Sequence, residues 1–165
     1  MKALYIELSQ RIRGECNELE YVIQRALRAW SQAQRIPDEQ VAYLDSVALN
    51  LHGFYSGLER LFELIARHID HSLPEGETWH RDLLHQMSHD IEDIRPAVID
   101  RERALSLDEF RRFRHLVRNV YTMSLVPDKI SGLISKLPGL WEKLCAEMLA
   151  FGDFIEELAE ATKDK

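Results

Sequence analysis

Apolar residues recur at intervals of three and four along the first part of the chain, which is the spacing that places them on one face of an α-helix. The first stripe runs from Leu4 to Trp30 and predicts a long amphipathic helix that ends near Ile36. Pro37 then interrupts it and opens a second stripe that continues to Ile69. Because the connection is short, we expect the two helices to form an antiparallel hairpin.

The middle of the chain predicts shorter elements. Proline and glycine mark residues 72–77 as a loop, after which Thr78 is placed to cap a helix that reaches about Ile91. Residues 94–98 contain a proline and break the helical pattern. The prediction for this region is therefore one short helix between two loops.

Ser106 indicates the start of the next helix, because Glu109 follows at the spacing at which the two side chains can satisfy each other's backbone N–H groups. This helix is expected to reach about Met123. The last helical region begins near Pro127 and contains Pro138, which predicts a short piece, a kink or break, and then a longer helix to about Thr162.

No segment shows the strict alternation of a β-strand, and we find no repeat or low-complexity segment. The sequence predicts an all-α fold, an up-and-down bundle of about five helices. A length of 165 residues with 45% hydrophobic content fits one compact domain over residues 1–165. In such bundles, sites are built from side chains on facing helices or between subunits.

Charge is unevenly distributed along the chain. The formal net charge of -7 argues against a protein that coats nucleic acid with its whole surface. Residues 101–118 reverse this balance, with six arginines against three acids. The arginines are Arg101, Arg103, Arg111, Arg112, Arg114 and Arg118, and the acids are Glu102, Asp108 and Glu109. We call residues 101–118 the basic segment, and it is the best candidate for contact with an anion.

A helical projection divides the second half of the basic segment into two faces. The apolar arc holds Phe110, Phe113, Leu116, Val117 and Val120, and the polar arc holds Arg114, His115, Arg118, Asn119 and Tyr121, with Arg111 one turn below. A solvated outer face is the simpler interpretation. Such faces usually interleave Glu and Lys, however, whereas arginine is preferred where a planar fork holds a phosphate.

The run from Arg114 to Tyr121 resembles the motif helix of the HepT-like ribonucleases of the HEPN superfamily, which carries an arginine, a polar neighbour, a histidine and a tyrosine. Residues 54–60, 79–81 and 95–98 are also similar to this family, so that the resemblance extends from about Val47 to the last helix. Asn119 stands where the motif has its histidine, and His115 follows the arginine. The imidazole has therefore moved by about one helical turn, roughly 5 Å.

The resemblance implies metal-independent RNA cleavage, in which a ribose 2′-hydroxyl attacks the adjacent phosphate. His115 is the candidate base, because Asn119 cannot exchange a proton at ordinary pH. Arg114 and Arg118, with Arg111 below them, are assigned to the phosphate and its transition-state charge. Asn119 would orient the 2′-hydroxyl or a phosphate oxygen, and Tyr121 would donate to the same phosphate.

The resemblance also implies partners. Members of this family pair as homodimers whose motifs meet in one cleft, and their usual partner is a nucleotidyltransferase antitoxin that adds AMP to the motif tyrosine, here Tyr121. RNA, with tRNA as the candidate, is the implied substrate, and neither a cofactor nor a metal is implied. Two alternatives stay open: a catalytically degenerate member that binds RNA or the nucleotidyltransferase without cleaving, and a bundle whose arginines hold a mononucleotide.

Other residue groups favour structural interpretations. His80, His85 and His89 lie close together but lack an accompanying cysteine, so solvated histidines are favoured over a zinc site. The aromatic residues Trp30, Phe54, Tyr55, Phe62, Trp79 and Trp141 are expected in the core. Gly53 and Gly57 would allow close helix approach. Cys16 and Cys145 are expected to be buried thiols, and without a disulfide pattern, a signal peptide or a membrane span we expect a cytoplasmic protein.

Overall fold

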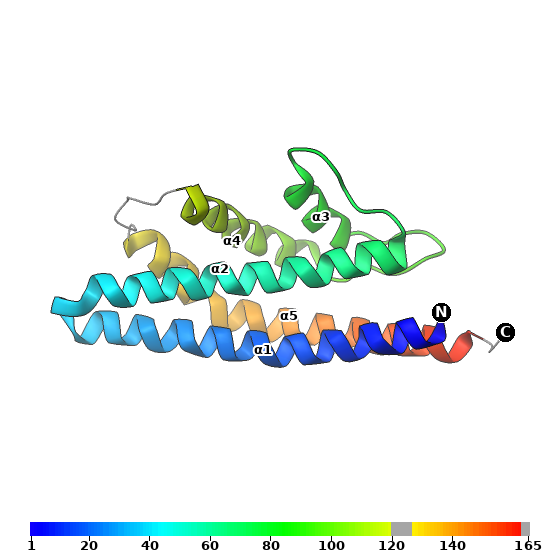
Figure 1. The fold of residues 1–165 in the computed structure, drawn as a ribbon, viewed down its shortest axis with the longest axis horizontal. Helices are drawn as coiled ribbons and strands as arrows, with labels where there is room; N and C mark the ends of the chain where they lie inside the picture. The colour runs from blue at the N-terminus through cyan, green and yellow to red at the C-terminus, as the bar shows by residue number, and fades with distance from the viewer. Residues whose placement is uncertain (120–126, 163–165) are drawn as a thin grey trace.

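The computed structural model describes residues 1–119 and 127–162, with the side chains of Arg118 and Asn119 left out. Its elements are α1 (Lys2–Arg35), the 3₁₀ turn η1 (Pro37–Glu39), α2 (Gln40–Ile65), the π-helical turn η2 (Ala66–Asp70), α3 (Trp79–Met87), α4 (Arg101–Asn119) and α5 (Pro127–Ala161) (Figure 1). The only pairing of β type among these residues is an isolated bridge between Ile91 and Arg95. The predicted all-α bundle of five helices is confirmed.

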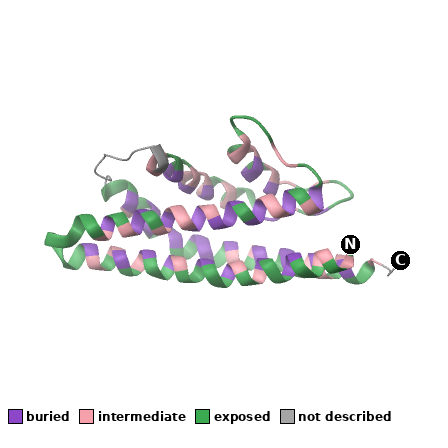
Figure 2. Cartoon of the chain, viewed as in Figure 1, coloured by how far each residue is buried: buried purple, intermediate pink, exposed green. Residues whose placement is uncertain are grey.

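Helices α1 and α2 form the predicted antiparallel hairpin, joined through η1, and α5 packs along α1 (Figure 1). The shorter helices α3 and α4 lie against α2 on the side away from α1. Buried positions recur turn after turn along α1 and α2 (Figure 2), as the three-and-four spacing of their apolar residues requires. Helix α2 is thus the shared wall between the long hairpin and the α3–α4 layer.

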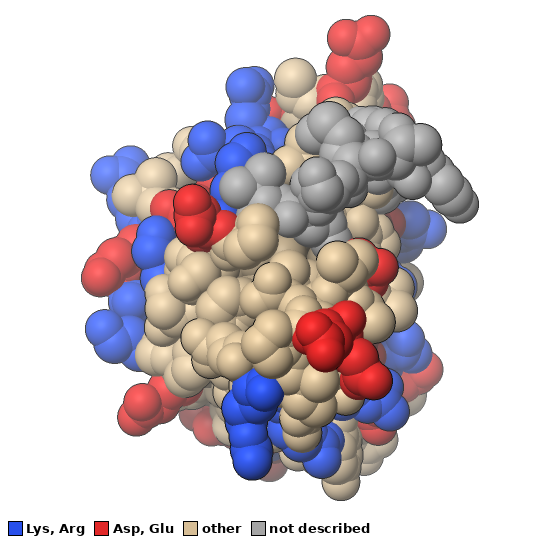
Figure 3. Space-filling view, turned by 90° about the vertical axis from the view of Figure 1, so that its left-hand side faces the viewer, with Lys and Arg blue, Asp and Glu red and all other residues tan. Residues whose placement is uncertain are grey.

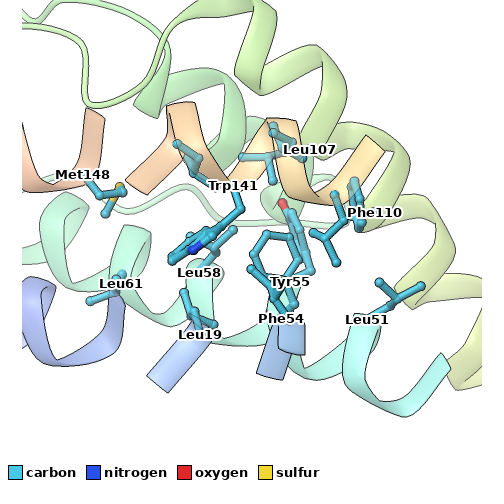
Figure 4. Close-up of a cluster of buried hydrophobic side chains, with 14 of the residues drawn as sticks. Leu19, Leu51, Phe54, Tyr55, Leu58, Leu61, Leu107, Phe110, Trp141 and Met148 are labelled. Atoms are coloured by element: carbon cyan, nitrogen blue, oxygen red, sulfur yellow. The ribbon is translucent and has the colours of Figure 1, made fainter. Parts of the chain in front are cut away.

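The core is continuous across this wall. Phe54 of α2 makes edge contacts with Phe110 of α4 and with Trp141 of α5, at ring-centroid distances of 5.5 and 6.0 Å (Figure 4). The core placement expected for aromatic residues is confirmed for Phe54, Tyr55, Phe62 and Trp141, which are buried. Trp30 and Trp79 are only half-buried.

Close approach of α1 and α2 depends on Gly57. A Cβ atom at this position would lie 2.8 Å from Cδ2 of Leu19 and 3.2 Å from Oε1 of Glu15. Gly53 is less restricted, since its nearest neighbour would be a Val22 carbon at 4.0 Å. Close approach of the two helices, which was expected at both glycines, is therefore seen at Gly57.

The start of α4 differs from the prediction. The helix begins at Arg101, and a side-chain oxygen of Asp100 accepts a hydrogen bond of 2.6 Å from the backbone N–H of Glu102. The backbone N–H of Asp100 donates in turn to Glu147 of α5, at 3.0 Å. Because this anchored cap acts before Ser106 is reached, Ser106 lies inside the helix and the predicted capping box was wrong.

Helix α3 ends at Met87 and not near Ile91, because the carbonyl oxygen of Met87 accepts hydrogen bonds from the backbone N–H groups of Val98 and Ile99. Thr78 does precede the helix, but its hydroxyl donates to the Asp82 carboxylate at 2.7 Å and caps no backbone group. The backbone contact between residues 98–99 and the end of α3 joins positions about ten residues apart, and the sequence pattern did not predict it.

Helix α5 runs through Pro138 without a break, so of the predicted kink or break the break was wrong. Leu137 and Leu140 are buried on either side of the proline. Burial of both flanking turns outweighs the backbone hydrogen bond that a proline removes. Figure 1 shows the first turns of α5, in yellow, inclined to the remainder.

The two thiols differ in burial. Cys16 is buried, and burial together with the neighbouring Cys145 raises the pKa of its thiol to about 12. Cys145 is half-buried, so the expectation of two buried thiols was wrong for this residue. Among the described residues, no helix has the length and apolar character needed to cross a membrane.

A pair of glycine substitutions tests the α1–α2 contact. Gly14→Ala, whose new Cβ would meet no packing neighbour within 4 Å beyond its own stretch of helix, should raise the free energy of unfolding by about 0.5–1 kcal/mol through helix propensity. Gly57→Ala should not show this gain. Overpacking against Leu19 should instead lower its free energy of unfolding by about 1–3 kcal/mol relative to the wild type. Urea denaturation of both variants measures the difference, and equal effects would show that the interface yields.

Candidate functional site

Arg114, the first residue of the motif, points into the protein. It is 6% exposed, although the helical projection assigned it to the polar face. Arg114 lies at the border of the two arcs, and α2 and α3 both pack against α4 on that side. A border residue with a long side chain is buried or exposed according to what covers it.

The guanidinium of Arg114 forms a bidentate ion pair with Glu59 of α2. Its Nη1 lies 2.8 Å from Oε1 and its Nη2 lies 3.0 Å from Oε2 of a carboxylate that is itself buried. Nη1 also lies 3.5 Å from the hydroxyl of Ser56. Such a forked pair combines charge with geometric specificity, and each partner needs the other because both are removed from water.

His80 of α3 joins this pair. Its Nδ1 lies 2.8 Å from Oε2 of Glu59 and 3.0 Å from Nη2 of Arg114. The imidazole therefore completes a cluster that links α2, α3 and α4, which we call the Glu59 cluster (Glu59, His80 and Arg114). Its ring is also stacked on that of Trp79, with centroids 3.6 Å apart.

Tyr55 forms the floor of the Glu59 cluster. The Arg114 guanidinium carbon lies 4.9 Å from the centre of the Tyr55 ring, which is a cation–π contact. Burial, and to a lesser extent the Glu59 carboxylate, raise the pKa of the Tyr55 phenol, so that it stays neutral. Nε of Arg114 is buried without a hydrogen-bond partner among the described residues.

The basic segment is largely neutralised by acids. Asp108 pairs with Arg111 at 2.7 Å and with Arg112 at 3.1 Å on the same helix. Glu147 of α5 pairs with Arg103 at 2.8 Å, as Glu59 of α2 pairs with Arg114. Four of the six arginines in this segment therefore have acid partners, and two of these acids come from other helices.

A hollow of about 610 Å³ lies between the start of α3 and α4. It is lined from α4 by Arg111 and His115, which are four residues apart and so lie on one helix face. The other wall is residues 76–81, which include Trp79, His80 and Arg81. The hollow thus gathers two histidines, two arginines and the acid Glu77 beside the buried Glu59 cluster, and we call it the α3–α4 pocket.

The other predicted site residues are only partly placed. His115 is exposed at the α3–α4 pocket. Arg118 and Asn119 belong to the last turn of α4, and their side chains are among those left out of the description. Tyr121 lies outside the described residues.

The three grouped histidines separate into two environments. His80 bonds Glu59, whereas the rings of His85 and His89 stack at 4.2 Å. Nδ1 of His89 lies 2.8 Å from the carbonyl oxygen of His85.

Sequence reasoning assigned no functional role to Glu59, and it favoured a solvated His80 and a core position for Trp79. A signal was nevertheless present, because residues 54–60 and 79–81 contribute to the family resemblance. An isolated acid in the middle of a predicted amphipathic helix, at a position on its apolar face, also indicates a buried charge that needs a partner.

Comparison with known proteins identifies the class of protein that this fold and helix motif define. A family model described as HepT-like protein matches residues 46–155, which is more than half of the chain. The chain therefore belongs to the HepT-like family of the HEPN superfamily, which is generally a family of nucleases. Neither the curated proteins nor the solved structures include a match.

Removing the Glu59 charge tests the cluster. Glu59→Gln should lower the free energy of unfolding by about 3 kcal/mol or more, because it leaves the Arg114 charge buried without a counter-charge. The control, Glu63→Gln, changes a half-buried acid one turn further along α2 and should cost less than about 1 kcal/mol.

The double variant Glu59→Leu with Arg114→Met should recover much of the loss, since it removes both charges together. Denaturant titration measures all three proteins. Equal stability of the Glu59→Gln and Glu63→Gln variants would contradict the structural importance of this pair.

Proposed function

We propose that this protein is a metal-independent endoribonuclease, the toxin of a HEPN/nucleotidyltransferase toxin–antitoxin pair, with RNA and in particular tRNA as its substrate. The observation that carries the proposal is the α3–α4 pocket, in which the motif helix of a HepT-like protein presents His115 beside Arg111. A histidine and an arginine on one wall supply a proton acceptor and a charge for a phosphate.

In the proposed reaction the ribose 2′-hydroxyl attacks the adjacent phosphate and the 5′-oxygen leaves. His115 accepts the 2′-hydroxyl proton, and Arg111 and Arg118 balance the charge that develops on the phosphate. Asn119 orients the 2′-hydroxyl or a non-bridging oxygen, and Tyr121 donates a hydrogen bond to the same phosphate. No step requires a metal ion.

Arg114 takes a different part from the one that the motif alone suggests. Both of its terminal nitrogens bond Glu59, so it reaches a phosphate only by leaving a buried counter-charge. We therefore propose that in this conformation Arg114 is a positioning residue that holds Glu59, and that Arg111 and Arg118 contact the substrate.

We further propose that the protein acts in the cytoplasm as a homodimer and is controlled by a nucleotidyltransferase that adds AMP to Tyr121. A second copy would supply the wall that the open α3–α4 pocket lacks. Exposed apolar side chains occur on α2 and α4, among them Val41, Leu49 and Leu105. The end of the bundle where α1 turns into α2 also has a largely uncharged centre (Figure 3).

A second candidate function is a HepT-like protein that binds RNA or its nucleotidyltransferase without cleaving. It is favoured by two observations: Asn119 occupies the position of the motif histidine, and the motif arginine is neutralised by Glu59. The two candidates differ in whether His115 has taken over the proton transfer.

Cleavage in the presence of EDTA tests the first candidate. The purified protein should cut tRNA and leave a 2′,3′-cyclic phosphate, and His115→Ala should lower the rate about 10²–10⁴-fold, the usual contribution of a positioned base. His68→Ala is the control, because this half-buried histidine does not line the α3–α4 pocket. Intact tRNA with every protein would exclude the ribonuclease.

Restoring the motif histidine separates the two candidates. If His115 already transfers the proton, Asn119→His should change the cleavage rate little. If the protein is degenerate, the same substitution should create cleavage that the unchanged chain lacks, because it returns an imidazole to the motif position. Product analysis by denaturing gel electrophoresis reads both outcomes.

A further inference from the structure

We propose that His80 is the acid of the reaction, the residue that protonates the leaving 5′-oxygen. This inference rests on the proposed function and extends it from one helix to two. His80 comes from α3 and faces the α3–α4 pocket opposite His115 of α4. The site would then be a pair of histidines, one that takes a proton and one that gives it.

The chemistry requires such a partner. As His115 accepts the proton of the 2′-hydroxyl, the freed oxygen bonds to phosphorus and the bond from phosphorus to the 5′-oxygen breaks. The departing oxygen then needs a proton, which Nε2 of His80 supplies. The products are a 2′,3′-cyclic phosphate and a 5′-hydroxyl, with His115 protonated and His80 neutral. Arginine cannot take this role, because it does not release its proton in this pH range.

The geometry of the ring supports the assignment. Nδ1 of His80 is turned inward, 2.8 Å from Oε2 of Glu59 and 3.0 Å from Nη2 of Arg114, which leaves Nε2 as the nitrogen on the far side of the ring. As the acid, the ring carries a proton on Nδ1 that it donates to Glu59, because the arginine has only N–H donors. His80 lines the pocket, and its side chain is 27% exposed, so the ring bridges the buried carboxylate and the open space. A carboxylate that accepts from one ring nitrogen and orients the other toward substrate is a recurrent arrangement in acid–base catalysis.

The contacts of the Glu59 cluster distinguish His80 from His85. Glu59 is buried and fixed by the bidentate contact with Arg114, and the imidazole is further restrained by stacking on Trp79. His85 lies on the same helix, and no carboxylate of the described part of the chain bonds its ring, which instead stacks on that of His89. Glu59 and Arg114 are thus positioning residues, and His80 is the group that would touch substrate.

Charges around the pocket suit a phosphate placed between the two histidines. Arg111 and Arg81 line it together with one acid, Glu77, whereas the acid partners of the two arginines, Asp108 and Asp82, do not. The side chain of Arg81 is 63% exposed and its contact with Asp82 is long, at 3.6 Å. It can therefore turn toward an incoming anion at little cost.

A substrate with a better leaving group identifies the acid. We would compare a short RNA with the same RNA carrying sulfur in place of the 5′-oxygen at the cleaved bond, since a thiolate leaves without a proton. His80→Asn is the test variant, because the asparagine amide keeps a donor for Glu59 and removes Nε2. His85→Asn, on the same helix but outside the pocket lining, is the control.

His80→Asn should cleave ordinary RNA about 10²–10⁴-fold more slowly than the wild type and the sulfur substrate at nearly the wild-type rate. His115→Ala should be impaired on both substrates, and His85→Asn on neither. Unchanged cleavage of ordinary RNA by His80→Asn would overturn the inference. An equal loss on both substrates would also overturn it, since that result indicates a structural effect.

A binding measurement separates failure of this inference from failure of the proposed function. Adenosine 3′-monophosphate, added to the wild-type protein, should shift the NMR signals of the His80 and His115 rings together and leave that of His85 unchanged. A shift of His115 alone would overturn the placement of His80 in the site. A wild-type protein that cleaves no RNA would overturn the ribonuclease and, with it, the acid role of His80.

Discussion

The buried ion pair between Glu59 and Arg114 is the interaction on which the arrangement of the α3–α4 layer depends. Neither charge is tolerable inside the protein without the other, so the pair holds α4 against α2 at one rotation about its axis. That rotation turns Phe110 into the core and His115 outward. Glu59 also binds His80 and thereby fixes the start of α3.

This constraint changes the meaning of the basic segment. Along the sequence, arginines outnumber acids in this segment, and the natural interpretation is a surface that attracts phosphate. In the folded protein Arg103 and Arg114 meet acids from α5 and α2. The α3–α4 pocket nevertheless keeps Arg111, which pairs with Asp108, and Arg81 beside two histidines.

Membership in the HepT-like family and the geometry of this pocket bear on different questions. The family indicates the kind of chemistry, whereas the pocket suggests which side chains of this chain perform it. The motif helix α4 forms only one wall of the pocket, and the segment that begins α3 forms the other. A substitution at the motif histidine, such as Asn119, therefore does not remove every imidazole from the site.

Periodicity and composition alone determined the all-α class, the α1–α2 hairpin and the helix that carries His115, because these follow from local spacing of apolar residues. Tertiary contacts decided the rest. Arg114 lies at the border of two helix faces, and only the presence of Glu59 across the interface turns it inward. Helix α4 starts after Asp100, which caps it and is itself bonded by Glu147 of α5. Helix α5 continues through Pro138 because the residues on either side of the proline are buried. A sequence pattern records what each residue prefers, but the packing partner determines which preference prevails.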